Sequence, residues 1–163
     1  MNYANIKPVD ISNGTGVRVS LFVSGCTHRC KGCFNREAWD FNFGQEFTTD
    51  TFNQIIDLLK PDYISGLSLL GGEPLENANY WLVVSLVGAV KYLYPRKTIW
   101  LYTGYKWEDI KHFSIFNYID VVVDGEFKEE LKDISLNFRG SSNQRIIDVK
   151  KSKSKNEVVL MEV

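Results

Sequence analysis

Apolar residues alternate with other side chains along residues 17–23, and this period of two predicts a half-buried strand. Continuous apolar runs predict three more strands, buried on both faces, at residues 64–70, 98–102 and 119–123. A glycine follows each of these three runs within two residues, which is typical of a strand end. We therefore expect a sheet with at least four strands.

Helical spacing of apolar residues predicts the elements that cover this sheet. Positions i, i+3, i+4 and i+7 are apolar over residues 52–59, and Pro61 ends that helix. A strongly apolar helix is predicted at 81–93, ended by Pro95, and a short one at 107–113. Alternating strands and helices predict parallel strands with covering helices, and these strands are too few for a closed eight-stranded barrel. The fold class that we expect is an open, partial barrel.

All three cysteines lie directly after the first predicted strand, at the spacing C-x3-C-x2-C: Cys26, Cys30 and Cys33. Three thiolates are one fewer than the four that complete a structural zinc site or an ordinary four-iron cluster. A cluster held by three cysteines keeps one iron free for a ligand that is not protein. Gly25 and Gly32 permit the backbone turns that such a short ligand loop needs.

The spacing alone leaves a second metal site open. His28 lies between two of the cysteines and could complete a tetrahedral Cys3His zinc site, as in a zinc-binding interaction module. Zinc motifs usually draw their ligands from two separated pairs, however. A disulfide with one spare thiol is disfavoured, because the spacing is tight and nothing marks the chain as secreted.

A second motif, Gly71-Gly72-Glu73-Pro74, follows the predicted strand at 64–70. Two glycines at a strand end remove side chains that would keep a ligand away from the backbone. The exposed carbonyl and N–H groups could hold an ammonium group, and Glu73 adds negative charge. By itself this motif is a turn more often than a site. Its position one strand after the cysteines favours a site.

These residues resemble a known family. The cysteine spacing after a first strand, with the aromatic Phe34 beside the last cysteine, resembles the signature of radical S-adenosylmethionine (SAM) enzymes. Within that group, the chain resembles the activating proteins of anaerobic (class III) ribonucleotide reductase over about residues 1–145. The matching segments include 21–26, 32–35, 71–75, 102–105, 123–125 and 139–144.

The resemblance implies a fold and a set of site residues. The fold would be the partial, open (βα) barrel of the radical SAM type, an α/β architecture with covering helices. One [4Fe-4S] cluster would be held by Cys26, Cys30 and Cys33. SAM would be bound by Gly32, Cys33, Phe34, Gly72 and Glu73, and no catalytic residue is needed beyond the cluster and SAM. Residues Arg139–Gln144 could contact SAM or a partner.

The resemblance also implies a reaction. The enzyme would cleave SAM reductively and use the 5′-deoxyadenosyl radical to form a glycyl radical on the large subunit of anaerobic ribonucleoside-triphosphate reductase. A low-potential electron donor such as a flavodoxin is implied, because reducing a sulfonium requires a cluster of low potential. An activase of another glycyl-radical enzyme, of the pyruvate formate-lyase type, is the alternative; the segment Arg139–Gln144 speaks against it.

Length and composition set the remaining expectations. A chain of 163 residues is long enough for one domain, which we place at residues 1–149. Residues 150–163 are expected to form a basic linker and an edge strand, not a separate domain. The net charge of −1 gives no general footprint for nucleic acid or a membrane surface. With no signal peptide or apolar span in the sequence, a cytoplasmic protein with reduced thiols is expected.

Overall fold

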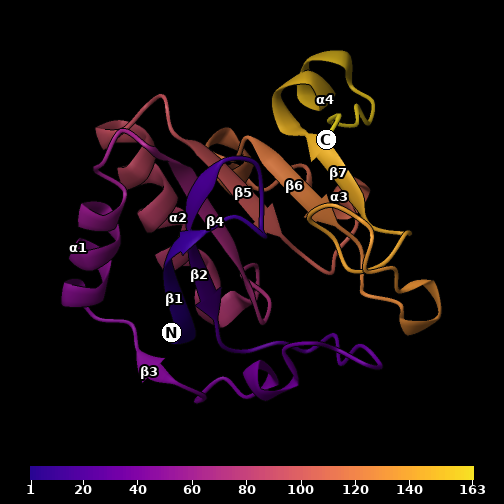
Figure 1. Ribbon diagram of the computed structural model, residues 1–163, viewed down its shortest axis with the longest axis horizontal. Coiled ribbons are helices and arrows are strands. Elements are labelled where there is room, and N and C mark those ends of the chain that lie inside the picture. The colour runs from indigo at the N-terminus through magenta and orange to yellow at the C-terminus, as the bar shows by residue number, and fades with distance from the viewer.

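The computed structural model describes all 163 residues, and its strands form a single sheet (Figure 1). Seven strands lie in the order β3-β1-β2-β4-β5-β6-β7. Their bounds are β1 (Asn2–Asp10), β2 (Val17–Val23), β3 (Gln45–Glu46), β4 (Ile64–Gly71), β5 (Thr98–Tyr102), β6 (Val121–Asp124) and β7 (Arg145–Asp148). The four strands expected from apolar patterns, β2, β4, β5 and β6, are the central four and run parallel.

The expected fold class is wrong, because the sheet is mixed and is no (βα) barrel of parallel strands with covering helices. Strands β1 and β3 are antiparallel to their neighbours at one edge, and β7 is antiparallel to β6 at the other. An antiparallel neighbour needs no helical crossover. Residues 1–16, for which the apolar pattern predicts no strand, supply β1 and the turn that brings the chain back to β2. Strand and loop thus make up much of the chain.

Four α-helices complete the fold: α1 (Thr49–Leu58), α2 (Asn77–Leu93), α3 (Trp107–Ile110) and α4 (Val149–Lys155). Thr48 caps α1, because its side chain accepts a hydrogen bond from the N–H of Thr51. Only α1 and α2 exceed seven residues. No helix combines the length and the apolar character that crossing a membrane would require.

Alternate residues of each central strand face different environments. One face packs against the helices in a core of 24 buried residues, to which β2 contributes Val19, Leu21 and Val23. The other face carries buried polar groups of the same strand, Arg18 and Ser20. The guanidinium of Arg18 donates to the Oγ of Ser68 at 2.8 Å, so a buried polar network crosses from β2 to β4. This explains the polar positions inside the strand pattern.

The C-terminal residues lie against strand β7. The lysine-rich run expected as a linker is the helix α4, and Asp148 caps it by accepting a hydrogen bond from the N–H of Lys151. After α4, Leu160 forms an isolated antiparallel bridge with Ile147. The N–H of Met161 also donates to the carbonyl of Ile146 at 2.9 Å. This segment therefore covers the outer edge of β7.

Candidate iron–sulfur site

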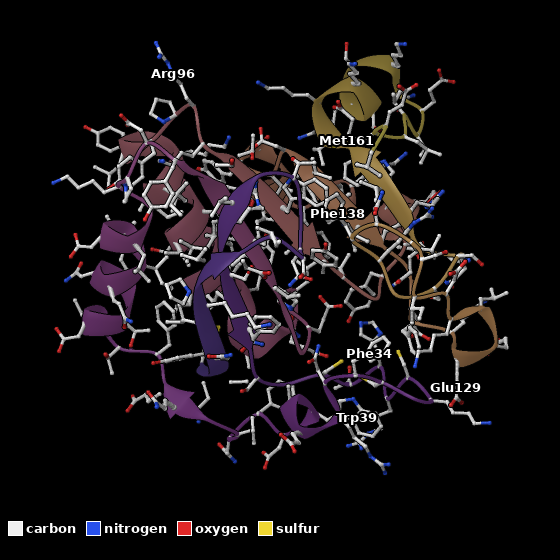
Figure 2. The ribbon with its side chains drawn as sticks, in the orientation of Figure 1. Phe34, Trp39, Arg96, Glu129, Phe138 and Met161 are labelled. Atoms are coloured by element: carbon white, nitrogen blue, oxygen red, sulfur yellow. The ribbon has the colours of Figure 1, made fainter.

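The three cysteines lie in one loop that leaves the carboxyl end of β2. All three are free thiols and partly exposed. They line one cavity of about 510 Å³ together with Gly71, Gly72 and Glu73 from the end of β4. Figure 2 labels Phe34 and Trp39, which line the same cavity, in the lower part of the molecule. The structure thus brings together the two motifs that the sequence places one strand apart.

Backbone hydrogen bonds hold the start of the cysteine loop. The N–H of Gly25 donates to the carbonyl of Ala38 at 2.7 Å, and the N–H of Glu73 donates to the carbonyl of Gly25 at 2.8 Å. Gly72 lies so close to this loop that a Cβ there would be 2.5 Å from the carbonyl oxygen of Gly25. Glycine is therefore required at position 72 by the close approach of two backbones.

Glu73 accepts hydrogen bonds from four groups and is only 1% exposed. Its Oε1 accepts from the ring of His28 at 2.7 Å, from the Thr103 hydroxyl at 2.9 Å and from the N–H of Gly104 at 2.8 Å. Its Oε2 accepts from the N–H of Leu75 at 3.0 Å. The carboxylate therefore ties the cysteine loop to the ends of β4 and β5.

His28 is bound by two carboxylates. Its Nε2 lies 2.7 Å from Glu73 Oε1, and its Nδ1 lies 3.1 Å from Glu126 Oε1. The hydrogen bond to Glu73 raises the pKa of His28 above its ordinary value, against the opposing effect of burial. Both ring nitrogens thus have partners other than a metal. Nowhere do three His, Cys, Asp or Glu side chains converge on one point, as the Cys3His zinc alternative would require.

Burial disfavours ionisation of two of the three thiols, Cys26 and Cys30. Burial raises the pKa of Cys26 to about 11, and burial followed by the nearby Glu126 carboxylate raises the pKa of Cys30. The Sγ of Cys33 accepts a 3.4 Å hydrogen bond from the N–H of Asn35. Binding a metal therefore releases protons. Three cysteine sulfurs that line one cavity are the donor set of a cluster in which each sulfur binds a different iron.

The far wall of the cavity is the loop between β6 and β7. Phe127 packs against Phe34 with ring centroids 4.9 Å apart, and the Lys132 ammonium lies 5.0 Å from the centre of the Phe34 ring. Arg139 and Gln144 of this loop also line the cavity. The two halves of the chain thus meet around the cysteines. The role of Phe127 was not evident from the sequence, since no local pattern indicates which distant ring it meets.

Three buried polar atoms have no hydrogen-bond partner in the protein: Trp39 Nε1, Arg139 Nε and Asn143 Oδ1. Trp39 and Arg139 line the cavity that contains the cysteines. Buried polar atoms in folded proteins are nearly always paired, so such orphans indicate a partner outside the chain. Together with three free thiols, they make the cavity a fitting site for a cluster and a small polar ligand. No local sequence pattern points to a role for Trp39.

Comparison with known proteins defines the class of this site. A family model described as a 4Fe-4S single cluster domain matches residues 12–147, and this match indicates a four-iron cluster. Among curated proteins, the anaerobic ribonucleoside-triphosphate reductase-activating protein of Enterobacteria phage T4 is 47% identical over 90% of this chain and 93% of its own.

Two further relatives carry the same name. The protein of Escherichia coli K12 is 46% identical over 88% of this chain and 96% of its own. The protein of Vibrio cholerae is 45% identical over 90% of this chain and 97% of its own. The chain belongs to the family of anaerobic ribonucleoside-triphosphate reductase-activating proteins. The resemblance described from the sequence motifs is thereby confirmed.

Proposed function

We propose that this chain is a radical SAM activase that generates a glycyl radical on anaerobic ribonucleoside-triphosphate reductase. The observation that carries the proposal is the single cavity in which three free cysteines meet the Gly-Gly-Glu end of β4. Family membership supports the partner, because the relatives are named as activating proteins of that reductase.

In this proposal Cys26, Cys30 and Cys33 hold the cluster. The bound cluster supplies one electron that cleaves the sulfur–C5′ bond of SAM to give methionine and a 5′-deoxyadenosyl radical. The protein holds the sulfurs in place, because the loop is anchored to Ala38 and to the end of β4.

The remaining cavity residues are assigned to SAM. A volume of about 510 Å³ lies within the range of small-molecule sites. Gly72 leaves the end of β4 without a side chain, and Phe34 lies on the cysteine side of the cavity. Gly32, which the sequence resemblance also assigns to SAM, is exposed and does not line the cavity. The partnerless Nε of Arg139 favours an anionic group such as the SAM carboxylate. Glu73, which has four protein donors, acts by holding the loop.

The substrate of the radical is assigned to another protein. A chain of 163 residues that already surrounds a cluster and SAM has little room for a large substrate pocket of its own. We assign the hydrogen abstraction to a backbone glycine of the reductase large subunit. The electron is assigned to a low-potential donor such as a flavodoxin.

Anaerobic reconstitution with iron and sulfide, followed by dithionite and SAM, tests the proposal. We expect 5′-deoxyadenosine, and on addition of the reductase a glycyl radical signal in electron paramagnetic resonance. The variant Cys30→Ala is the matched control and should form neither. A fully loaded cluster that yields no 5′-deoxyadenosine would contradict the proposal. Radical formation on pyruvate formate-lyase but not on the reductase would favour the alternative activase.

A further inference from the structure

The indole N–H of Trp39 is a buried donor that nothing in the protein accepts. Trp39 is the last residue of a short 3-10 helix, Arg36–Trp39, and it lines the cavity that contains all three cysteines. Figure 2 labels Trp39 beside the cysteine loop. A buried N–H without an acceptor costs about 1–3 kcal/mol. An acceptor that arrives with the cofactor would remove this cost.

The backbone places Trp39 next to the first cysteine. The N–H of Cys26 donates to the carbonyl of Trp39 at 3.2 Å, and the neighbouring bond from Gly25 to Ala38 continues this pairing. Cys26 and Trp39 also line a second cavity together. Trp39 therefore contacts Cys26 through the backbone and shares two cavities with it.

Two guanidinium groups hold the ring. Arg29 and Arg36 lie 5.4 Å and 5.2 Å from the centre of the Trp39 ring. Arg29 adopts a left-handed backbone conformation, with φ of 54°. Cations over the ring restrict its rotation, and they withdraw electron density so that the N–H is a stronger donor.

We propose that the Trp39 N–H donates a hydrogen bond to a sulfur of the bound cluster at the Cys26 side and thereby raises its reduction potential. Hydrogen bonds to cluster sulfurs favour the reduced state, because that state carries more negative charge. Trp39 is thus a positioning and tuning residue, and it takes no part in bond breaking. The inference rests on the proposed three-cysteine cluster.

Removing the indole N–H of Trp39 tests its effect on the reduction potential of the cluster. Trp39→Phe keeps an aromatic ring but removes the N–H donor together with part of the indole ring, and Trp81→Phe, at a position 72% exposed on α2, is the control. At a fixed potential we expect the ratio of reduced to oxidised cluster to fall about threefold to tenfold in Trp39→Phe, where tenfold equals about 59 mV for one electron. Trp81→Phe should leave the ratio unchanged. Equal ratios in both variants would overturn the inference.

A spectroscopic measurement on the unaltered chain keeps the test independent of how the variant folds. With tryptophan labelled with ¹⁵N in the indole, electron–nuclear double resonance of the reduced cluster should show a ¹⁵N coupling and an exchangeable proton. A proton coupling without ¹⁵N would assign the donor to water and overturn the inference. A cluster that forms without either coupling overturns it too, while the proposed function stands. A chain that takes up no cluster overturns both.

Discussion

His28 Nε2 lies 2.7 Å from Glu73 Oε1, and this contact joins the cysteine loop to the end of β4. The same carboxylate also accepts from Thr103 and Gly104 at the end of β5. One buried side chain thus positions three segments around the cavity. The Gly-Gly-Glu motif therefore serves two purposes: its glycines allow close approach, and its carboxylate holds the loop.

Glu73→Gln should lower the free energy of unfolding of the cluster-free chain by about 1–3 kcal/mol, because a buried donor is left without an acceptor. In the unaltered chain the N–H of Leu75 donates to Glu73 Oε2. An amide nitrogen in place of Oε2 would leave this N–H without an acceptor. Anaerobic urea unfolding measures this. The matched change Glu157→Gln, at an exposed position after α4, should have little effect. Equal stability of the two variants would refute the role given to Glu73.

His28→Ala separates a cluster from a zinc site. We expect the variant to bind one four-iron cluster per chain, because both ring nitrogens of His28 are engaged by Glu73 and Glu126. Its unfolding free energy should fall, since Glu73 loses one donor. Iron, sulfide and zinc analysis after anaerobic reconstitution checks this. Loss of all bound metal in His28→Ala, with zinc bound in the unaltered chain, would instead support the Cys3His alternative.

The periodicity of apolar residues predicts the central strands of the sheet but not the edge strands. Strands β2, β4, β5 and β6 were predictable, because their buried positions form runs or strict alternation. Strand β1 was not, because most of its residues are exposed or half-buried and the sequence NYANIKPVD has no clear period. Alternating strands and helices predict an open, partial barrel, and the antiparallel direction of the edge strands has no local signal in the sequence that would correct this prediction.

In the site, too, the sequence alone indicates some features and not others. Cysteine spacing and the Gly-Gly-Glu motif are local, so the sequence alone indicates them. Three of the four donors to Glu73 are not local, since His28, Thr103 and Gly104 lie 45, 30 and 31 residues away along the chain. The partnerless N–H of Trp39 also depends on tertiary packing. Contacts between distant segments have no periodic signature, and for that reason only the structure shows which groups surround the cysteines.

Two glycines should respond to alanine in opposite directions. Gly72→Ala puts a Cβ 2.5 Å from the carbonyl of Gly25, and such overpacking should cost about 1–3 kcal/mol. Gly88→Ala, inside α2, meets only Tyr118 at 3.7 Å and should stabilise the chain by about 0.5–1 kcal/mol. Thermal unfolding of both variants, with iron uptake for Gly72→Ala, checks this. A stable Gly72→Ala chain with full iron uptake would show that the backbones can separate at no cost.

Arg145 contacts one buried and one exposed carboxylate, which allows an internal comparison. Asp124, 1% exposed, lies 3.0 Å from the Arg145 Nε and also accepts from the N–H of Trp107. Asp124→Asn should cost about 2–3 kcal/mol, because a buried charged hydrogen bond is lost. Glu108 is 53% exposed on its side chain, so Glu108→Gln should cost about 0–1 kcal/mol. Urea unfolding at two salt concentrations distinguishes the Arg145–Asp124 pair from the Arg145–Glu108 pair. Equal losses of unfolding free energy in the two variants would contradict the larger contribution assigned to Asp124.

Asp10 should make stability depend on pH in the acid range. It is 6% exposed and accepts hydrogen bonds from Ser20, Asn13 and the N–H of Ser12 at 2.7, 2.7 and 2.9 Å. Burial alone would raise the pKa of Asp10, but these hydrogen bonds outweigh it and hold the pKa below its ordinary value. Because the folded chain favours the charged carboxylate, the stabilisation is present above the unfolded pKa of about 3.9. It is lost as the pH falls through the lower folded pKa.

Asp10→Asn therefore should be less stable than the unaltered chain by about 1–2 kcal/mol at pH 6, and the difference should shrink steadily below about pH 4. Unfolding of the cluster-free chain in urea across pH 3–7 measures it. Asp62→Asn, at an exposed position, is the control and should show a small difference at every pH. If the difference in unfolding free energy between Asp10→Asn and the unaltered chain stayed constant down to pH 3, the charge of Asp10 would contribute nothing to stability. The cost would then come from shape alone.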